Sequence, residues 1–526
     1  MKFRDFLSSY LKHNPSDSYI VKEGTIEFEP TAYYEILRKK NPVIFFEHLK
    51  GYPEYKLVTN LFGSSSRIAQ AIGVRKEELG KFWHMAMNGS SNPRVKSDGA
   101  VKEIYVKGDD LNLLQLPAPM HYANDGGRYI TAGLVAARDP GDPSSINLTY
   151  SRIELLGKDT MALNAGSRGH FWSYLQNNKE RHLSTKVSII IGADPLLYAI
   201  AAARTDNEYS KAAALGGIDL TEGIANDIPV PADSEIVIEA EVNPDQEYDE
   251  GPFTEYTGYV SESSTRNFGR VSGIMRRKNP IFLDITPSNS AEHVLLSSIS
   301  SELALQGLLH RLPPYRDYRV SLPLSGTLYL AFGSVSTQET DLSKQLGLLL
   351  LGNDYYLKVA LVNVGTHIGG LFEYLSNAAA NGQNEQGKDI EIVRDVFCNL
   401  LDPSLTPGGA TSKAIWITRG DGKYLMNAGE DWAELVKDGA SVHIGRETSK
   451  KHKISILVDP DINPSDEDEV TWSLATRTQP LSDFHFKDGA TTIDARKPAI
   501  AARRASLPPD VLAVVRKKVE NNAPQC

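Results

Sequence analysis

A single long helix is predicted near the middle of the chain, from residue 291 to residue 312. Ser290 is suited to cap its start and Glu292 lies in the first turn, where a carboxylate is favourable. Pro313-Pro314 is expected to end it, because proline cannot continue a helix. Apolar residues recur along it at helical spacing, at Leu295, Ile299, Leu303 and Leu309. Since strand-rich sequence lies on both sides, the helix is expected to connect two folded regions.

The region before this helix, from about residue 110 to 285, is rich in short β-branched runs that end at glycine, proline or aspartate. Tyr129–Ala136, Val187–Ile191 and Glu235–Glu239 are such runs. Their spacing predicts a β-barrel or sandwich with inserted helices.

The rest of the chain mixes helical and strand patterns. Pro42–Glu47 is predicted as a strand and Ser64–Ile72 as a capped helix. With 526 residues the chain is long enough for two or three domains. We expect a mixed α+β chain made of an N-terminal α/β region at 1–110, a strand-rich domain at 111–290, the connecting helix at 291–315, a C-terminal α/β domain at 316–490 and a helical tail at 491–526.

Composition and charge exclude several classes of protein. The net charge of -10 argues against general nucleic-acid binding. Two cysteines, Cys398 and Cys526, provide neither a disulfide framework nor a thiolate zinc site. No apolar leader follows Met1, and the longest apolar stretch, Val187–Ala203, is interrupted by Asp194-Pro195. The sequence therefore predicts a cytoplasmic protein that binds neither nucleic acid nor membrane.

Motifs of several common enzyme classes fail on inspection. Asp459–Asn463 resembles the start of a calcium loop, but Pro464 replaces the required glycine and Val470 the required glutamate. Gly408–Lys413 has the wrong order for a phosphate-binding loop, and no dinucleotide fingerprint follows a strand. The sequence also contains no GxSxG or HExxH motif. Kinase, serine hydrolase and zinc protease activities are therefore not expected.

Two carboxylates, Glu250 and Glu255, flank a Gly-Pro turn and form the most informative short motif. Paired carboxylates near one pocket push their pKa values apart, which provides one acid and one base. Arg152, in a predicted strand, is able to grip a carboxylate with two hydrogen bonds. Taken singly, these residues also fit a surface loop and a surface ion pair. His170 and Glu208 alone likewise fit a structural histidine and a helix-surface acid.

Taken together, these residues resemble the UbiD family of decarboxylases. Its order and approximate spacing are matched by Asn147 with Arg152, His170, Ile191–Pro195, Glu208 and the Glu250–Glu255 motif. The resemblance runs from about residue 1 to 485 and extends to Phe45–Pro53, Asn60–Ser64, Pro231–Val237, Val458–Asn463 and Trp472–Arg477.

The resemblance implies a fold, an activity and a set of partners. The fold is a split β-barrel that binds prenylated FMN, joined by the long helix to a C-terminal α/β oligomerisation domain. The activity is reversible, non-oxidative decarboxylation of an aromatic, heteroaromatic or α,β-unsaturated carboxylic acid through a covalent adduct with prenylated FMN. The partners are this small-molecule acid, a flavin prenyltransferase that supplies the cofactor, and further copies of the chain in a homodimer or homohexamer.

The same resemblance assigns roles to individual residues. The catalytic residues are Arg152, Glu250 and Glu255, with Glu255 as proton donor and the other two as an ion pair that orients the substrate carboxylate and the cofactor ring. The cofactor phosphate is held by Mn²⁺ and K⁺. The manganese ligands are Asn147, His170 and Glu208, a hard mixed set that suits this ion. The cofactor-binding residues are Asn147, Ser151, Arg152, Gly169, His170, Glu208 and Lys453.

Some features leave the substrate and the reaction direction open. Gly169 is small where some relatives carry a polar side chain, which favours a ring-bearing acid. Ile456 and Leu457 are expected to make the pocket apolar. The alternatives are an aromatic-ring carboxylase that runs the same site in reverse, a flavin-binding reductase, and a non-catalytic scaffold. The acid pair argues against a reductase, because redox chemistry at a flavin needs no such pair.

Overall fold

The computed structural model describes residues 2–166, 169–203, 205–312, 318–336, 340–354, 356–365, 367–380, 390–394, 412–419, 423–449, 451–497 and 503–521. Pro313-Pro314, Cys398 and Cys526 lie outside these residues. The chain divides into two compact units, Met1–Ser300 together with Arg503–Cys526, and Ser301–Ala502. The second unit is thus inserted in the sequence of the first. The finer five-part division stays a prediction.

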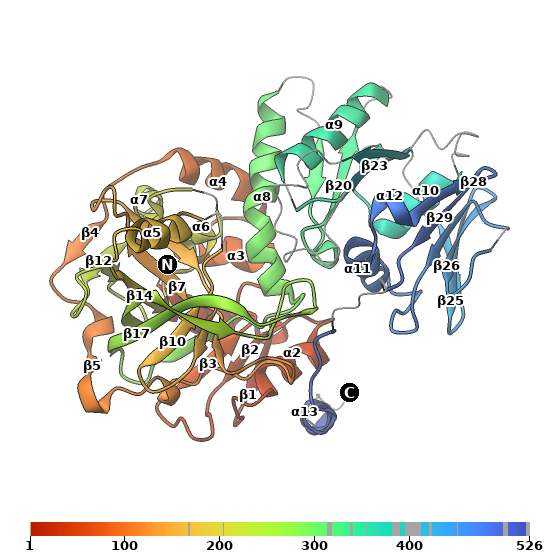
Figure 1. The fold of residues 1–526 in the computed structure, drawn as a ribbon. Coiled ribbons are helices and arrows are strands. Elements are labelled where there is room, and N and C mark those ends of the chain that lie inside the picture. The colour runs from red at the N-terminus through yellow and green to blue at the C-terminus, as the bar shows by residue number, and fades with distance from the viewer. Residues whose placement is uncertain are drawn as a thin grey trace. The chain divides into compact units, whose positions relative to one another are not determined.

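A nine-stranded sheet, in which every pair is antiparallel, forms the body of the first unit (Figure 1). In spatial order its strands are β6 (Tyr129–Ile130), β9 (Ile153–Leu155), β10 (Thr160–Leu163), β17 (Ser264–Arg276), β14 (Ile236–Glu250), β11 (Thr185–Ile191), β7 (Leu134–Arg138) and β8 (Ile146–Tyr150), with β5 (Ile104–Val106) beside β17. Val187, Ile189 and Ile190 of β11 are fully buried. Burial on both faces explains why isoleucines follow one another without alternation at the end of this strand, Ile189–Ile191.

The two edge strands of this order, β6 and β8, are each followed in the chain by a strand from the opposite end of the sheet. β6 leads into β7 and β8 leads into β9, each across a short break. The N–H of Ser151, in the second break, donates to the carbonyl of Gly133, in the first, at 3.4 Å. The sheet therefore curves back on itself as a barrel that is split at these breaks. The predicted split β-barrel is confirmed.

The N-terminal residues add a second sheet. It contains β1 (Ser18–Val21), β2 (Val43–Phe46), β3 (Lys56–Thr59) and β18 (Ile281–Asp284), so its last strand comes from the end of the barrel region. The capped helix predicted at 64–72 is α3 (Ser65–Ala71), whose cap Ser64 accepts the N–H of Arg67 at 3.2 Å. The other helices of this unit include α1 (Phe3–His13), α2 (Glu29–Leu37), α4 (Leu79–Asn88), α5 (His170–Lys179), α6 (Pro195–Ala201) and α7 (Glu208–Ala214). β4 (Arg94–Lys96), β12 (Asp219–Glu222) and β13 (Pro229–Pro231) form a small third sheet.

The predicted long helix is α8 (Ala291–Arg311), drawn in green in Figure 1. Ser290 caps it, since its hydroxyl accepts the N–H of His293 at 3.2 Å. The buried carboxylate of Glu292 accepts the N–H groups of Asn60 at 2.8 Å and Phe62 at 2.7 Å, which fixes the first turn to the segment after β3. Burial raises the pKa of Glu292 to about 8.

The last described helix, α13 (Pro509–Asn521), packs on α2 (Figure 1). Val515 is fully buried and the Lys518 ammonium lies 2.8 Å from the Glu29 carboxylate. The basic end of the chain is therefore anchored to the first unit. The expected helical tail starts inside β29 (Ala490–Asp494), the last strand of the second unit.

The second unit contains two further sheets. One has the order β19 (Arg319–Ser321), β20 (Leu330–Val335), β21 (Val359–Val364), β23 (Ser412–Arg419) and β22 (Ile390–Arg394). The other has the order β24 (Leu425–Ala428), β25 (Trp432–Lys437), β26 (Ala440–Gly445), β27 (Ile454–Leu457), β29 and β28 (Phe484–Lys487). Its helices include α9 (Thr340–Asn353), α10 (Leu371–Ala380), α11 (Glu467–Arg477) and α12 (Pro480–Asp483). The predicted α/β character of this region is confirmed.

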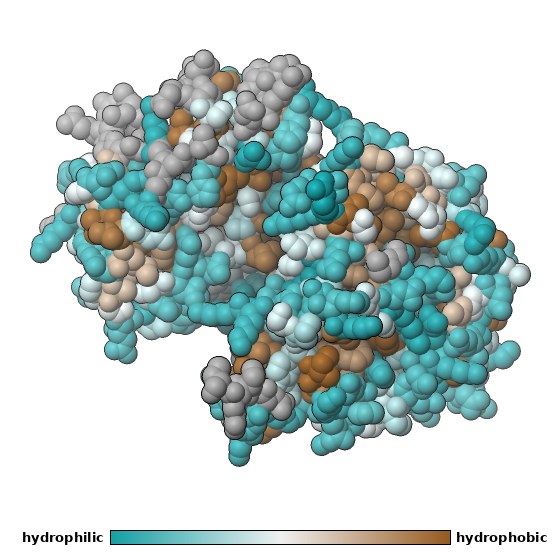
Figure 2. All heavy atoms as spheres, turned by 180° about the vertical axis from the view of Figure 1, so that it is seen from behind, coloured by the Kyte–Doolittle hydropathy of each residue, from teal (hydrophilic) through white to brown (hydrophobic). Residues whose placement is uncertain are grey.

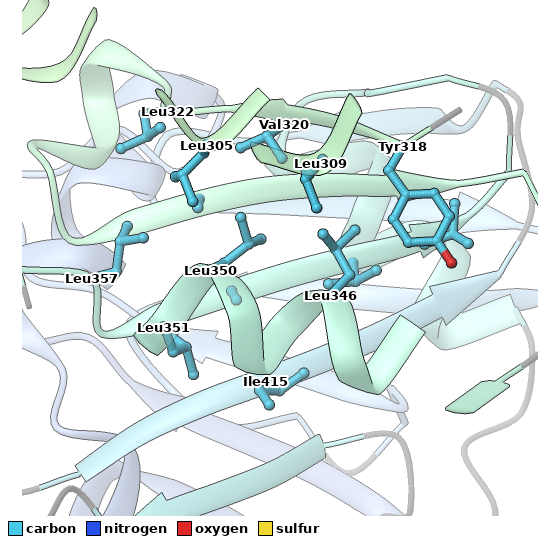
Figure 3. Packing of buried hydrophobic residues seen from close by; sticks show 14 residues of the cluster. Leu305, Leu309, Tyr318, Val320, Leu322, Leu346, Leu350, Leu351, Leu357 and Ile415 are labelled. Carbon is cyan, nitrogen blue, oxygen red and sulfur yellow. The ribbon is translucent and has the colours of Figure 1, made fainter. Parts of the chain in front are cut away.

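One hydrophobic cluster forms the core of the first of these sheets (Figure 3). Leu305 and Leu309 come from the second half of α8, and Leu346 and Leu350 come from α9. Of the predicted stripe, Ile299 and Leu309 are buried, whereas Leu295 and Leu303 are only half-buried. Val294, Leu296 and Leu305 are buried in addition. The cluster gives the second unit a core of its own.

The face of the molecule shown in Figure 2 is mostly hydrophilic, with hydrophobic residues in scattered patches. Among the helices in the described part of the chain, none has both the length and the apolar character that a bilayer span needs.

Leu346→Ala should destabilise the second unit, because it leaves a cavity beside fully buried neighbours. The expected loss in free energy of unfolding is about 2–5 kcal/mol. Leu348→Ala is the matched control, since Leu348 is on the same helix but is 44% exposed. Urea denaturation of both variants measures the difference, and equal losses would show that α9 does not pack as described.

Candidate active site

Arg152 lies at the break between β8 and β9, where the barrel is split. Its Nε and Nη2 donate to the two carboxylate oxygens of Glu250, at 2.7 and 2.9 Å. Its Nη1 donates to the carboxylate of Glu255. The structure therefore brings the three predicted catalytic side chains together around one guanidinium. The contact with Glu250 is the bidentate geometry that planar guanidinium and carboxylate groups favour.

The three side chains differ in their access to water. Glu250 is fully buried, the Arg152 side chain is 10% exposed and the Glu255 side chain is 31% exposed. Burial opposes the charge on Arg152, but the carboxylates of Glu255 and Glu250 outweigh it and raise the pKa of the guanidinium. Arg152 is thus always a cation, and Glu255 is the carboxylate of the three side chains that contacts solvent.

An aromatic pair supports this guanidinium from one side. The Arg152 guanidinium carbon lies 4.6 Å from the ring centre of Phe253, and the Phe253 ring centre lies 4.6 Å from that of Tyr129. A cation over an aromatic face is stabilised by the ring quadrupole. These contacts restrict the guanidinium to the plane in which it meets both carboxylates.

Glu154 is a site residue that the sequence analysis missed. It lies in β9, two residues after Arg152. Its buried carboxylate accepts the N–H of Gly251 at 3.2 Å, next to Glu250. Burial raises the pKa of Glu154. The sequence signal for Glu154 was its spacing of two residues from Arg152, because side chains two residues apart share a face of extended backbone.

A short hairpin carries Glu255. Its strands are β15 (Phe253–Thr254) and β16 (Val260–Ser261). The N–H of Glu255 donates to the carbonyl of Tyr259 at 2.8 Å, and the carbonyl of Glu255 accepts the N–H of Gly258 at 2.9 Å. Glu255 is therefore the first residue of a tight turn, and the φ of +84° at Gly258 suits glycine.

A second segment, residues 122–127, holds this hairpin from the other side. Asp125 is buried and accepts both the N–H and the hydroxyl of Thr254 at 2.8 Å. Burial raises the pKa of Asp125. The N–H of Gly126 donates to the carbonyl of Pro252 at 2.6 Å, and a Cβ on Gly126 would lie only 2.4 Å from the Gly251 oxygen. The Gly-Pro turn is thus seated on a segment that leaves no room for a side chain.

His293, in the first turn of α8, also lies at this site and was missed by the sequence analysis. Its ring is edge-on to Tyr256, with 6.3 Å between the ring centres. Its Nδ1 lies 3.1 Å from the carbonyl of Ser288, so this nitrogen is assigned as the donor. Burial lowers the pKa of His293, although the carboxylate of Glu255 opposes this effect. The expected form is a neutral ring with Nε2 as acceptor.

The predicted metal ligands come from three elements. Asn147 is on β8, and α5 and α7, which begin at His170 and Glu208, both pack against that strand. The buried carboxylate of Glu208 accepts the N–H of Leu148 at 2.8 Å, beside Asn147. The buried amide nitrogen of Asn147 has no hydrogen-bond partner among the described residues. His170 is exposed.

This set fits a hard divalent cation. The Glu208 carboxylate is buried beside Asn147 and forms no ion pair within the part of the chain that the structure describes, and burial raises its pKa to about 7. Oxygen ligands with one imidazole suit manganese. Within the described residues, no three His, Cys, Asp or Glu side chains form a metal cluster of another kind.

The other predicted cofactor residues lie in different surroundings. Ser151 is buried and donates its hydroxyl to the carbonyl of Asn164 at 3.0 Å. Among the described residues, a Cβ on Gly169 would meet only the Gly166 oxygen, at 3.6 Å, which is an ordinary contact. Lys453 belongs to the second unit, where its N–H donates to the carbonyl of Ser441 at 3.1 Å. Ile456 and Leu457 are buried on β27 of that unit, and the roles of these three residues toward the cofactor or substrate stay predictions.

Comparison with known families matches three domain models of one family. Residues 19–85 match the N-terminal domain of 3-octaprenyl-4-hydroxybenzoate carboxy-lyase. Residues 93–290 match its Rift-related domain, and residues 440–502 match its C-terminal domain. The Rift-related match contains all the predicted site residues except Lys453.

Two curated relatives are decarboxylases. An anhydromevalonate phosphate decarboxylase of Methanosarcina mazei is 29% identical over 306 residues, which cover 57% of this chain and 69% of that protein. A phenolic acid decarboxylase of Bacillus subtilis is 25% identical over 409 residues, which cover 72% of this chain and 83% of that protein.

Solved structures share the fold. The UbiD-class enzyme HmfF from Pelotomaculum thermopropionicum, in complex with FMN, has a TM-score of 0.72 at 28% identity, over 80% of this chain and 94% of that one. The 3,4-dihydroxybenzoic acid decarboxylase of Klebsiella pneumoniae has a TM-score of 0.72 at 20% identity, over 81% of this chain and 98% of that one. Because the three domain models together match more than half of its residues, the chain belongs to the UbiD family of decarboxylases.

Proposed function

We propose that this enzyme decarboxylates an aromatic, heteroaromatic or α,β-unsaturated carboxylic acid without net oxidation, with prenylated FMN as cofactor and Glu255 as proton donor. The observation that carries the proposal is the guanidinium of Arg152, held by buried Glu250 and shared with the more exposed Glu255. The similarity to HmfF supports the choice of cofactor, since that enzyme has been solved with FMN and, in an evolved dimeric form, with prenylated FMN.

The chain has residues suited to hold this cofactor at the barrel. When bound, prenylated FMN supplies an electron sink for the carbon that loses CO2. Asn147, His170 and Glu208 would hold a manganese ion against the cofactor phosphate, with K⁺ as a second cation. The manganese would neutralise phosphate charge and would compensate the charge of the buried Glu208 carboxylate.

Arg152 is placed to orient the substrate. Glu250 occupies its Nε and Nη2, so the Nη1 edge, now paired with Glu255, is the edge that a substrate carboxylate would take. An incoming carboxylate would therefore displace Glu255 from the guanidinium. This exchange releases the Glu255 side chain beside the reacting carbon.

Glu255 then completes the reaction. Loss of CO2 leaves an electron pair on the substrate carbon, and protonated Glu255 donates its proton to that carbon. The resulting carboxylate regains a proton from solvent, to which its side chain is 31% exposed. The net change is one substrate carboxylate and one proton converted to CO2 and a C–H bond.

The same groups serve the reverse reaction, in which Glu255 takes the proton as CO2 is added. The absence of a side chain at Gly169 favours a ring-bearing acid as substrate. We also propose that a flavin prenyltransferase supplies the cofactor and that the second unit mediates assembly into a homodimer or homohexamer.

Glu255→Gln should abolish most decarboxylation, because the amide keeps the size and the contact with Arg152 but cannot donate the proton. We expect kcat to fall by about 10²–10⁴-fold, with prenylated FMN content unchanged. Glu262→Gln is the control, since Glu262 is exposed just after the same hairpin. CO2 release and mass spectrometry of the bound flavin provide the two measurements. A wild-type rate in Glu255→Gln would exclude Glu255 as the proton donor.

Arg152→Lys should lower kcat/KM by at least about tenfold, because an ammonium keeps the charge but cannot grip Glu250 with two parallel hydrogen bonds. Arg266→Lys is the control, since the Arg266 Nε lies 3.8 Å from the Glu250 carboxylate, beyond hydrogen-bond distance. Steady-state kinetics on the acid that the enzyme decarboxylates fastest compare the two. If both variants lose the same activity, the bidentate contact has no special role.

Glu208→Gln should lower the manganese and cofactor content together, because the amide removes the charged ligand but still accepts the N–H of Leu148. Loss of one such ligand or its support costs about 10–100-fold in metal affinity. Glu222→Gln, on the exposed end of β12, is the control. Metal analysis and flavin absorbance of both purified variants test this, and full manganese occupancy in Glu208→Gln would remove Glu208 from the ligand set.

A further inference from the structure

A short segment near the end of the chain, Arg503–Ser506, lies against the turn that carries Glu255. We call this segment the C-terminal strap. The N–H of Val260 donates to the carbonyl of Arg503 at 2.8 Å, and the N–H of Ala505 donates to the carbonyl of Gly258 at 3.0 Å. Between these bonds Tyr259 and Arg504 form an antiparallel bridge. The strap thus pairs with the strand that follows the turn.

This pairing converts a weak hairpin into a three-stranded ribbon. β15 and β16 each contain two residues, and a two-stranded hairpin of that size has little stability of its own. The strap covers the outer edge of β16, while β15 covers its inner edge. Gly258 and Tyr259 are buried in this arrangement. Since Tyr259 also accepts the N–H of Glu255, the strap acts one hydrogen bond away from the proton donor.

The strap also binds the second segment that supports this hairpin. The carbonyl of Ser506 accepts the N–H of Ala123 at 3.0 Å, and its hydroxyl donates to the side-chain oxygen of Asn124 at 2.7 Å. The next residue, Asp125, accepts both hydrogen bonds of Thr254, directly before Glu255. The strap therefore joins the two backbone segments that fix Glu255.

The strap is held in place from its far end. α13 begins three residues after Ser506 and packs on α2, with Val515 buried and Lys518 paired with Glu29. This anchor reduces the conformational freedom of the strap before it pairs with β16, so the pairing costs less entropy than it would for a free chain end.

We propose that the C-terminal strap is a positioning element for Glu255: it fixes the Glu255–Tyr259 turn so that the carboxyl group stays within reach of Arg152 and the reacting carbon. The proposal rests on the proposed role of Glu255 as proton donor. The strap is proposed to contact neither the substrate nor the cofactor, so it should influence proton transfer by Glu255 and not the binding of substrate or flavin.

Ala505→Pro tests the proposal in the full-length enzyme, because proline removes the N–H that bonds to Gly258. Ala505→Ser is the matched control, since it alters the side chain and keeps the N–H. The assay uses the member of a panel of benzoic, furoic and cinnamic acids that the unchanged enzyme decarboxylates fastest. We expect kcat to fall about tenfold in Ala505→Pro, as loss of one hydrogen bond allows, with KM and flavin content unchanged.

Hydrogen–deuterium exchange supplies a second readout that does not depend on activity. Amides of residues 253–260 should exchange about tenfold faster in Ala505→Pro than in Ala505→Ser, while those of β14 should not change. Ser506→Ala, which removes only the hydroxyl contact with Asn124, should shift exchange and kcat in the same direction by a smaller factor. This variant decides the matter if the proline variant does not fold.

Three results would overturn the proposal. Equal exchange in the strap variants and the control would mean that the strap does not hold the turn. Faster exchange with an unchanged kcat would mean that the turn needs no such support. A parallel fall of kcat, flavin content and melting temperature would indicate a role in general stability. Failure of the proposed function is distinct, because the unchanged enzyme, loaded with prenylated FMN, would then release no CO2 from any acid of the panel.

Discussion

The ion triad of Arg152 with Glu250 and Glu255 is the contact on which the rest of the site depends. A fully buried carboxylate such as Glu250 is costly unless a cation donates hydrogen bonds to it, and removing the partner of a buried pair costs about 3–5 kcal/mol. The fold of the barrel must therefore bring the Arg152 and Glu250 side chains into contact. It does so at the split, where the chain leaves β8 and re-enters the sheet as β9, opposite the end of β14.

Acid groups outnumber cations around this guanidinium. Glu154 and Asp125 are buried close to the triad, and burial raises the pKa of each. Both carboxylates accept backbone N–H groups of the Gly251–Thr254 loop, so their structural task is to hold the backbone and does not require a salt bridge. Arg152 is thus the cation that Glu250 and Glu255 share, and the proposed function requires a substrate carboxylate to compete with Glu255 for it.

The features that could be predicted from the sequence are those marked by a pattern of neighbouring residues, such as a helix cap or a β-branched run. The cap and apolar spacing predicted the long helix to within one residue at its end. The β-branched runs predicted β11 and the start of β14, whereas the run Tyr129–Ala136 spans β6, the break after it and the start of β7. Family resemblance predicted Arg152, Glu250 and Glu255, which the structure brings into contact. His293 and the strap were missed because their importance comes from contacts with residues far away in the sequence. The strap in particular has no alternation or turn signal, and the manganese set remains a prediction from the resemblance.

The three residues of the ion triad are therefore held by two different kinds of structure. Arg152 and Glu250 stand at strand ends of a nine-stranded sheet, whereas Glu255 stands on a hairpin of two-residue strands. That hairpin is contacted by His293, in the first turn of the helix α8 that leads out of the first unit, and by the strap, where the chain returns to that unit. A rigid cation–carboxylate pair suits the binding of substrate in one orientation. In the proposed function, Glu255 leaves Arg152 when the substrate binds, and a separately supported turn lets it do so without disturbing Glu250.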